Sequence, residues 1–372
     1  MILITLKIFS LTGGIEKVSR SLSKALLDLQ KIHKNETDNL KVISLCDKTI
    51  QANELYCEKE DFKGFNGNKI LFGLIAPIIA LRSNVIILSH INLLLIAVIV
   101  KLFSPKKKII LLAHGIEVWR NLSGWKKRFI RKNVEIWAVS KHTADILINK
   151  HKISSQNVTV LNNCLDPYFN IPETFKKPDY LLKRHGFSID QPILLTISRL
   201  SSFELYKGYD IVIENIKGLV KDFPDLTYII AGKSDLNEKL RLQKLIENEA
   251  LQKHVLVLDF ISDEELTDYF LLADTFIMPS KKEGFGLVFI EAAACGCNVI
   301  AGNQDGSKDA LLNGEIGLLI NPDDKGEIRN AIRQSLNDEN KEDLRRSKQN
   351  KCLNKFGFNI YRDQVEQMLH PA

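Results

Sequence analysis

The sequence lacks the features of secreted, disulfide-rich and membrane-spanning proteins. Its six cysteines include no C-x-x-C pair, and Cys295 and Cys297 enclose a single glycine, which is poor geometry for a zinc site. The longest apolar runs, at residues 70–81 and 93–100, are shorter than the roughly 20 residues that a spanning helix needs. The opening stretch MILITLKIFS has no basic segment ahead of an apolar one, so we expect no signal peptide. We therefore expect reduced, mostly buried thiols in a cytoplasmic protein.

Several catalytic motifs are missing as well. The sequence contains no H-E-x-x-H zinc motif, no G-x-S-x-G nucleophile turn and no P-loop, which argues against zinc proteases, serine hydrolases and P-loop nucleotidases. It also has no Asp-x-Asp pair that would hold a divalent ion against a diphosphate. We therefore expect no metal and no cofactor, and any bound phosphate would be neutralised by basic side chains and helix N–H groups.

The composition is that of a soluble globular protein of more than one domain. Of the 372 residues, 45% are hydrophobic and 26% are charged, which excludes disordered and collagen-like chains. The length exceeds that of an average domain, so we expect two domains of similar size.

The net charge of +6 conceals an asymmetry between the two halves. Residues 1–170 hold 25 Lys and Arg against 13 Asp and Glu, whereas residues 171–372 hold 26 against 32. The basic half is either a solvated surface or a surface that faces an anionic partner, such as the inner leaflet of a membrane or a lipid-linked acceptor. Nucleic acid is disfavoured, because no aromatic residues are interleaved with the basic clusters at residues 106–108 and 126–132.

Apolar runs of strand length alternate with helix-period segments through both halves. This alternation predicts two Rossmann-like domains, each with a doubly wound parallel sheet. The first is expected at residues 1–168 and the second at 178–355, separated by a proline-containing linker at 166–178. Predicted strands in the first domain lie at 2–9, 41–46, 85–89, 108–113, 135–139 and 158–161, and predicted helices at 16–29, 69–81, 93–103 and 142–151. Predicted strands in the second lie at 192–197, 226–231, 255–257, 275–278, 298–300 and 317–320, and predicted helices at 208–222, 237–249, 263–272 and 287–295.

A glycine-containing loop between a strand and a helix is the strongest candidate site. In residues 283–291 (EGFGLVFIE), Gly284 and Gly286 allow a ligand to approach the backbone, and the N–H groups that follow open a helix. Glu283 precedes the helix and Glu291 lies one turn beyond Leu287 on the same face. Carboxylates accept hydrogen bonds from sugar hydroxyls, so the pair suits recognition of a phosphorylated sugar. The alternative is a capping loop with solvated glutamates.

A basic pair follows another predicted strand. Arg199 comes directly after the buried strand PILLTI, and Lys207 precedes the next helix. An arginine and a lysine at a strand exit bind a diphosphate and stabilise it as a leaving group. Surface charges on a connecting loop are the alternative interpretation.

Two weaker features lie in the first half. Gly13 and Gly14 separate the first strand from a helix, but they do not complete a G-x-G-x-x-G fingerprint. His114 ends a buried strand and precedes Gly115. A single histidine at such a place is more often structural, but its position at a strand exit favours a functional role.

Taken together, these residues resemble glycosyltransferase family 4, which comprises retaining enzymes of the GT-B fold. Residues 283–291 resemble the family's E-x7-E motif and are followed by AACG, as is typical of the family. Arg199 and Lys207 resemble its diphosphate-binding pair, and the resemblance is strongest over residues 190–325. The seven residues between Arg199 and Lys207 exceed the family's common spacing.

The resemblance implies a role for each candidate residue. Arg199, Lys207, Glu283 and His114 would form the reacting centre. The donor would be a UDP- or GDP-sugar, and the acceptor a glycan or a lipid-linked glycan of a bacterial surface polysaccharide. The implied donor-binding residues are Gly13, Gly14, Gly232, Lys233, Gly284, Phe285, Gly286, Leu287 and Glu291.

The resemblance also concerns the domain arrangement and leaves alternatives open. It implies that the two domains face an interdomain cleft and that a C-terminal helix in residues 356–372 packs back on the first domain. The remaining alternatives are another GT-B enzyme acting on nucleotide sugars, such as an epimerase or a phosphorylase, and a non-catalytic nucleotide-binding protein.

Overall fold

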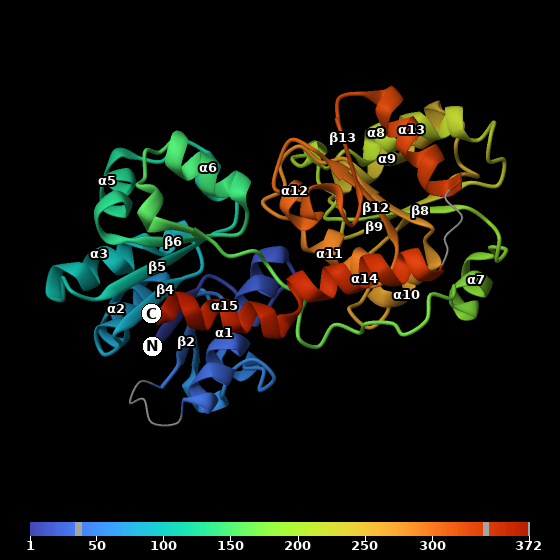
Figure 1. Cartoon of the computed structure of the whole chain (residues 1–372). Coiled ribbons are helices and arrows are strands. Elements are labelled where there is room, and N and C mark those ends of the chain that lie inside the picture. The colour runs from blue at the N-terminus through green and yellow to red at the C-terminus, as the bar shows by residue number, and fades with distance from the viewer. Residues whose placement is uncertain (34–38, 338–341, 371–372) are drawn as a thin grey trace. The chain divides into compact units, whose positions relative to one another are not determined.

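The computed structural model of the chain describes residues 1–33, 39–337 and 342–370. The chain divides into two compact units, each built on its own parallel sheet (Figure 1). Unit 1 comprises Met1–Pro167 and Phe356–Ala372, and unit 2 comprises Tyr168–Lys355. Residues 166–178 form neither helix nor strand. Part of this segment is bound to unit 2, since Thr267 donates to the Asn170 carbonyl oxygen at 2.7 Å.

Unit 1 contains a seven-stranded parallel sheet in the order β3-β2-β1-β4-β5-β6-β7. Its apolar strands are buried from both faces, as parallel strands between helices are. The strands are β1 (Ile2–Thr5), β2 (Lys41–Ser44), β3 (Phe62–Gly64), β4 (Val85–Leu88), β5 (Lys108–Ala113), β6 (Glu135–Ala138) and β7 (Val158–Val160). The helices are α1 (Gly14–Ile32), α2 (Lys69–Leu81), α3 (Leu94–Phe103), α4 (Ile116–Trp119), α5 (Gly124–Asn133), α6 (Lys141–Asn149) and α15 (Phe358–Leu369).

Helices cover both faces of the unit 1 sheet. Strand side chains alternate between two hydrophobic clusters: Ile86 and Leu88 of β4 belong to one, and Ile87 belongs to the other. Helices α2 to α6 contribute to the first cluster, whereas α1 and α15 contribute to the second. The C-terminal helix α15 therefore completes one face of unit 1, although it is far from the other helices of that unit in the sequence.

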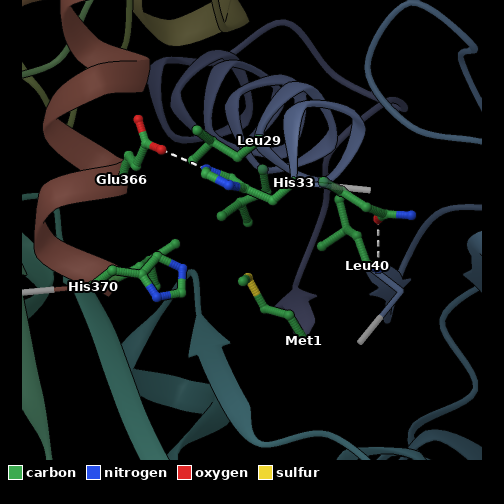
Figure 2. Close-up of a pocket in the computed structure, with 9 residues that line it drawn as sticks. Met1, Leu29, His33, Leu40, Glu366 and His370 are labelled. Atoms are coloured by element: carbon green, nitrogen blue, oxygen red, sulfur yellow. Dashed lines mark hydrogen bonds and ion pairs between the residues drawn. The ribbon is translucent and has the colours of Figure 1, made fainter. Parts of the chain in front are cut away.

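A pocket marks where α15 meets α1 and the segment before β2 (Figure 2). His33 at the end of α1 contacts Glu366 of α15, with Nε2 and Oε1 2.5 Å apart. The residues that line this pocket also include Met1, Leu40 and His370, but none of the predicted site residues. The candidate site is therefore elsewhere.

Unit 2 contains a six-stranded parallel sheet in the order β10-β9-β8-β11-β12-β13, and a large hydrophobic cluster packs against it. Its strands are β8 (Ile193–Ile197), β9 (Thr227–Ala231), β10 (Val255–Leu258), β11 (Thr275–Met278), β12 (Asn298–Gly302) and β13 (Leu318–Ile320). Its helices are α7 (Asp179–His185), α8 (Tyr209–Leu219), α9 (Leu236–Asn248), α10 (Leu266–Leu272), α11 (Leu287–Ala294), α12 (Ser307–Ala310), α13 (Lys325–Asn337) and α14 (Glu342–Phe356). The predicted fold class, two doubly wound parallel α/β domains, is confirmed.

The structure adds β3 and several helices to the predicted elements, and it also differs within three of the predicted ones. The first strand ends at Thr5 rather than residue 9, because the following backbone turns to bind a buried carboxylate. The C-terminal helical segment is interrupted at Gly357, which has extended backbone angles and separates α14 from α15. The helix predicted at residues 93–103 was expected to be buried, and this is wrong for one of its sides, since Leu102 and Phe103 are largely exposed.

Five of the six cysteines are buried and all six are free thiols, as expected. Burial raises the pKa of the Cys57 and Cys352 thiols to about 12, so both remain protonated and unreactive at neutral pH. In the part of the chain that the structure describes, no helix combines the length and the apolarity needed to cross a bilayer.

Candidate functional site

The predicted basic and acidic residues of unit 2 follow neighbouring strands of its sheet. β8 pairs with β11 on one side and with β9 on the other, and all three are parallel, so their carboxyl ends share one edge. Arg199 lies two residues after β8, Gly232 and Lys233 directly follow β9, and Glu283 lies in the loop after β11. This edge is where open α/β sheets bind their ligands.

Gly232 allows the loops after β8 and β9 to lie against each other. Its φ is +149°, and a Cβ atom there would come within 1.7 Å of the Ser198 carbonyl oxygen. Leu200 N–H donates to the Lys233 carbonyl oxygen at 3.0 Å, which continues the contact beyond the strands. The Lys233 side chain is exposed at this edge. The predicted role of Gly232 thus has a structural component: it holds the loop that presents Arg199.

The structure pairs each predicted cation with a carboxylate. Lys207 forms an ion pair with Glu283, and their side chains are only 16% and 13% exposed. Arg199 binds Glu204 through two nitrogens, with Arg199 Nε 3.2 Å from Glu204 Oε2. The Arg199 side chain is 71% exposed, so an anion from solvent can reach it. Lys207 is therefore held in a half-buried pair with Glu283, whereas the Arg199 pair lies at the surface.

Two residues of the loop between Arg199 and Lys207 belong to this cluster and were not singled out in the sequence. Glu204 supplies the counter-charge to Arg199. The carbonyl oxygen of Tyr206 accepts a hydrogen bond from Lys281 N–H at 3.0 Å, which connects the loop after β8 to the loop after β11. Burial, with the charges of Glu204 and Glu283 adding to it, raises the pKa of the Tyr206 phenol well above its usual range. The phenol is therefore a hydrogen-bond donor at this edge at any physiological pH.

The loop after β11 ends in the start of α11. Gly284 is half-buried and Phe285 is buried, which anchors the loop. Gly286 has a φ of +86° and caps α11 without a side-chain hydrogen bond, so the first N–H groups of the helix, from Leu287 onwards, have no capping side chain. Such N–H groups, at the positive end of the helix dipole, are a binding site for phosphate oxygens. Glu291 lies on α11 and is 5% exposed.

A buried aspartate in the loop after β12 positions Glu283. Asp305 is fully buried, and its Oδ2 accepts from Glu283 N–H at 2.6 Å and from the Ser280 hydroxyl at 2.7 Å. Its Oδ1 accepts from Ser307 N–H at 2.9 Å. The backbone closes the same loop, since Gly306 N–H donates to the Glu283 carbonyl oxygen at 2.8 Å. Asp305 is therefore a positioning residue for the predicted site, and no local pattern in the sequence indicates this role.

Replacing Asp305 by asparagine is expected to disturb this loop. Asparagine replaces one of the two carboxylate oxygens by an NH2 group, which donates and does not accept. Whichever oxygen is replaced, at least one buried donor loses its partner. We expect a loss of about 1–3 kcal/mol in the free energy of unfolding of unit 2. We also expect a lower kcat on whatever substrate the site turns over, measured by steady-state kinetics. Asp225→Asn, on an exposed turn of the same unit, is the control. Equal stability and kcat in the two variants would show that Asp305 does not position Glu283.

In unit 1, the predicted glycines lie at the start of the 19-residue helix α1. Gly13 caps α1 without a side-chain hydrogen bond, and both Gly13 and Gly14 are exposed. The loop before them is held by Asp47, which is fully buried and accepts from Ile8, Phe9 and Ser10 N–H groups at 2.8, 3.0 and 2.6 Å. Asp47, which sequence reasoning also missed, thus fixes the loop that presents the glycines.

His114 lies at the carboxyl end of β5, beside the end of β4. Its Nε2 is 2.8 Å from the Ser89 carbonyl oxygen, and its backbone N–H donates to the Glu117 carboxylate at 2.6 Å. A carbonyl oxygen only accepts, so His114 Nε2 donates this hydrogen bond. His90, after β4, is a neighbour that the sequence did not single out, and burial lowers the pKa of its imidazole. In unit 1, the glycines follow β1 and the two histidines follow β4 and β5, and these three strands are neighbours in the sheet.

Comparison with known proteins gives a family match within the unit that holds the basic and acidic cluster. Residues 181–351 match the family model described as Glycosyl transferases group 1. The matched segment includes Arg199, Lys207, Glu283 and Glu291, together with Asp305. Over its full length, the chain superposes on HepE of Anabaena, whose crystal structure contains UDP and glucose, with a TM-score of 0.79, 19% identity and coverage of 100% of both chains. The fold is that of the GT-B glycosyltransferases.

Two curated relatives extend the comparison. The chain is 31% identical over 163 residues to the GDP-mannose-dependent alpha-(1-6)-phosphatidylinositol monomannoside mannosyltransferase of Mycolicibacterium smegmatis, a match covering 42% of this chain and 41% of the relative. It is 27% identical over 317 residues to an uncharacterized 41.2 kDa protein in the cps region of Klebsiella pneumoniae, covering 79% of this chain and 83% of the relative. The chain thus spans less than half of the mannosyltransferase that it matches.

Proposed function

We propose that this chain is a retaining glycosyltransferase of family 4, moving an α-linked sugar from a UDP- or GDP-sugar to a glycan or lipid-linked acceptor. The observation that carries the proposal is the cluster at the carboxyl edge of the unit 2 sheet. It combines two cations, a half-buried carboxylate and an uncapped helix N-terminus, within a segment that matches group 1 glycosyl transferases. These are the groups that a sugar diphosphate requires: cations and N–H groups for the phosphates, and a carboxylate for the hydroxyls.

In the proposed reaction, the bond between the anomeric carbon and the diphosphate oxygen breaks as the acceptor oxygen attacks from the same face. The leaving phosphate takes the acceptor proton, so the products are the α-glycoside and a nucleoside diphosphate. Arg199, Lys207 and the N–H groups from Phe285 to Leu287 stabilise the charge that develops on the diphosphate. This arrangement assigns to protein groups the role of a divalent ion, and we propose that the reaction needs none.

The remaining predicted residues have recognition roles in the proposal. Glu283 accepts hydrogen bonds from the donor sugar while Lys207, with three donor hydrogens, contacts both Glu283 and the phosphate. Glu291 accepts from the ribose, and Gly232, Lys233 and Gly284 line the nucleotide side. Gly13, Gly14 and His114 of unit 1 are proposed to meet the sugar and the acceptor.

The biological setting is also proposed. A Klebsiella relative is named for its place in a cps region, and the mycobacterial relative is named for a phosphatidylinositol-linked acceptor. These names support a role in bacterial surface polysaccharide or glycolipid synthesis. We further propose that the protein acts in the cytoplasm, or at the inner face of the membrane.

A donor screen tests the proposal. The relatives are named with GDP-mannose and with UDP and glucose, so the panel should contain UDP- and GDP-linked hexoses and N-acetylhexosamines. We expect one donor to be consumed, with release of its nucleoside diphosphate, at the same rate with and without EDTA. Glu283→Ala and Arg199→Ala should abolish most of this turnover. The proposal fails if the whole panel is neither bound nor turned over, or if both variants match the wild type.

A further inference from the structure

Helices α2 and α3 of unit 1 expose large apolar side chains. On α2, Ile70, Leu74 and Ile78 are 79%, 65% and 56% exposed. On α3, Leu95, Leu102 and Phe103 are 60%, 75% and 73% exposed. The spacing of 4 on α2 and 7 or 8 on α3 places each set on one side of its helix.

These side chains are additional to the ones that hold the helices on the sheet. Phe72, Ala76 and Ala80 of α2 and Ala97 and Val100 of α3 are buried in the unit 1 core. The two helices pack against each other on the same face of the sheet, as Figure 1 shows. Their outward sides therefore form one surface, which is apolar where a surface helix normally carries polar residues. We call this surface the α2–α3 face.

Positive charge lies beside the α2–α3 face on the same side of the sheet. Residues 62–134, which contain α2, α3 and α5, hold 13 Lys and Arg and a single acidic residue, Glu117. Lys69 begins α2 next to Ile70, and Lys106 and Lys107 follow Phe103 after the end of α3. Helix α5 covers the same side of the sheet and carries five further cations at residues 126–132.

We propose that the α2–α3 face docks on the surface of an anionic lipid bilayer. The apolar side chains would enter the boundary between headgroups and acyl chains, and the lysines and arginines around them would bind the headgroups. The charge distribution decides between this occupant and a second copy of the chain. Two copies meeting through this face would bring Lys69, Lys106, Lys107 and the cations of α5 close to the same cations of the other copy, whereas an anionic membrane complements their charge.

The inference does not depend on the proposed transferase activity. It rests on exposure and charge in unit 1, and vesicle binding is measured without any substrate. If the protein proves not to be a transferase, the vesicle-binding data still test the docking surface independently.

The test is flotation of the full-length protein with vesicles of phosphatidylcholine alone and of phosphatidylcholine mixed with phosphatidylglycerol. We expect binding to the mixed vesicles at low salt and weaker binding at high salt, since screening reduces attraction between surface charges. The apolar variant is Leu74→Ser, Leu102→Ser and Phe103→Ser combined. Its matched control, Ile50→Ser, Ile189→Ser and Leu236→Ser combined, removes equally exposed apolar side chains elsewhere. We expect the apolar variant to bind at least tenfold more weakly than the control.

A charge variant tests the second component. Lys106→Gln, Lys107→Gln and Arg128→Gln combined should lower binding to the mixed vesicles, whereas Lys176→Gln, Lys183→Gln and Lys221→Gln in unit 2 should not. The proposal is overturned if the wild type ignores anionic vesicles, or if the apolar variant binds them as well as its control. A dimer seen by light scattering that the apolar variant abolishes would assign the face to a second copy instead.

Discussion

Replacing Lys207 by methionine is expected to lower the turnover of the donor by about 10²–10³-fold, the typical loss when one group that stabilises developing charge is removed. Methionine keeps most of the length and apolar volume of the side chain while removing the charge. In the structure, the Lys207 ammonium is fixed by Glu283, so it is already in place before the diphosphate charge develops. The measurement is kcat with the donor that the screen identifies.

The control for this prediction is Lys217→Met, which removes a lysine that is 67% exposed and pairs with Glu249 on the surface of unit 2. It should leave kcat unchanged. The pairing also predicts a coupling: Lys207→Met leaves the half-buried carboxylate of Glu283 without its lysine partner, so adding Glu283→Gln should restore stability but not turnover. A Lys207→Met enzyme with wild-type kcat would remove Lys207 from the reacting centre.

Much of the fold follows from the local sequence. Strands such as β5 and β8 are short apolar runs bounded by polar residues, and their period and length predict them directly. The sequence-based analysis missed the four-residue helices α4 and α12, and also α5, α7, α13 and α14, which are rich in charged residues. Among the described residues of α5 only Ile130 is buried, so hydrophobic periodicity gives no indication of that helix.

The exposure of α3 illustrates a different limit. An apolar segment is predicted to be buried whether it faces the core or the outside of the chain. The prediction uses only the chemistry of the side chains and has no information on what covers them. Leu94 and Leu95 are adjacent and chemically identical, yet one is fully buried and the other is 60% exposed. The three-dimensional placement of α3 on the sheet was needed to separate them.

The candidate site divides in the same way. Arg199, Lys207 and Glu283 were found because they stand at predicted strand exits beside glycines, which is a local pattern. Asp47 and Asp305 were missed because they act on backbone N–H groups far along the chain or in another loop, 39 and 22 residues away in the pairs Ile8–Asp47 and Glu283–Asp305. A buried acceptor for distant N–H groups has no sequence pattern of its own.

Replacing Asp47 by alanine is expected to have the largest effect on stability. It would leave the N–H groups of Ile8, Phe9 and Ser10 and the hydroxyl of Ser44 without the carboxylate that accepts from all four. Each buried donor without a partner costs about 1–3 kcal/mol, so we expect a loss of roughly 3 kcal/mol or more in the free energy of unfolding of unit 1. Thermal and denaturant unfolding measures this loss, and limited proteolysis shows which of the two units has unfolded.

The matched control is Asp145→Ala, which removes a half-exposed carboxylate that pairs with Lys141 on α6 of the same unit. A surface pair four residues apart on a helix contributes only about 0.3–0.5 kcal/mol. If Asp47→Ala is no more destabilising than Asp145→Ala, the three N–H contacts do not hold the loop that presents Gly13 and Gly14. Unit 2 should unfold as in the wild type in both variants.

The most direct measurement is the binding of UDP and of GDP to the unsubstituted protein and to Arg199→Ala, by calorimetry in the presence of EDTA. We expect one of the two nucleotides to bind without a metal, and its Kd to rise at least tenfold in the variant, because a charge-assisted hydrogen bond of an arginine to phosphate contributes about 1.5–3 kcal/mol. Failure of both nucleotides to bind, or equal affinity for the two proteins, would contradict a sugar-nucleotide site at the carboxyl edge of the unit 2 sheet.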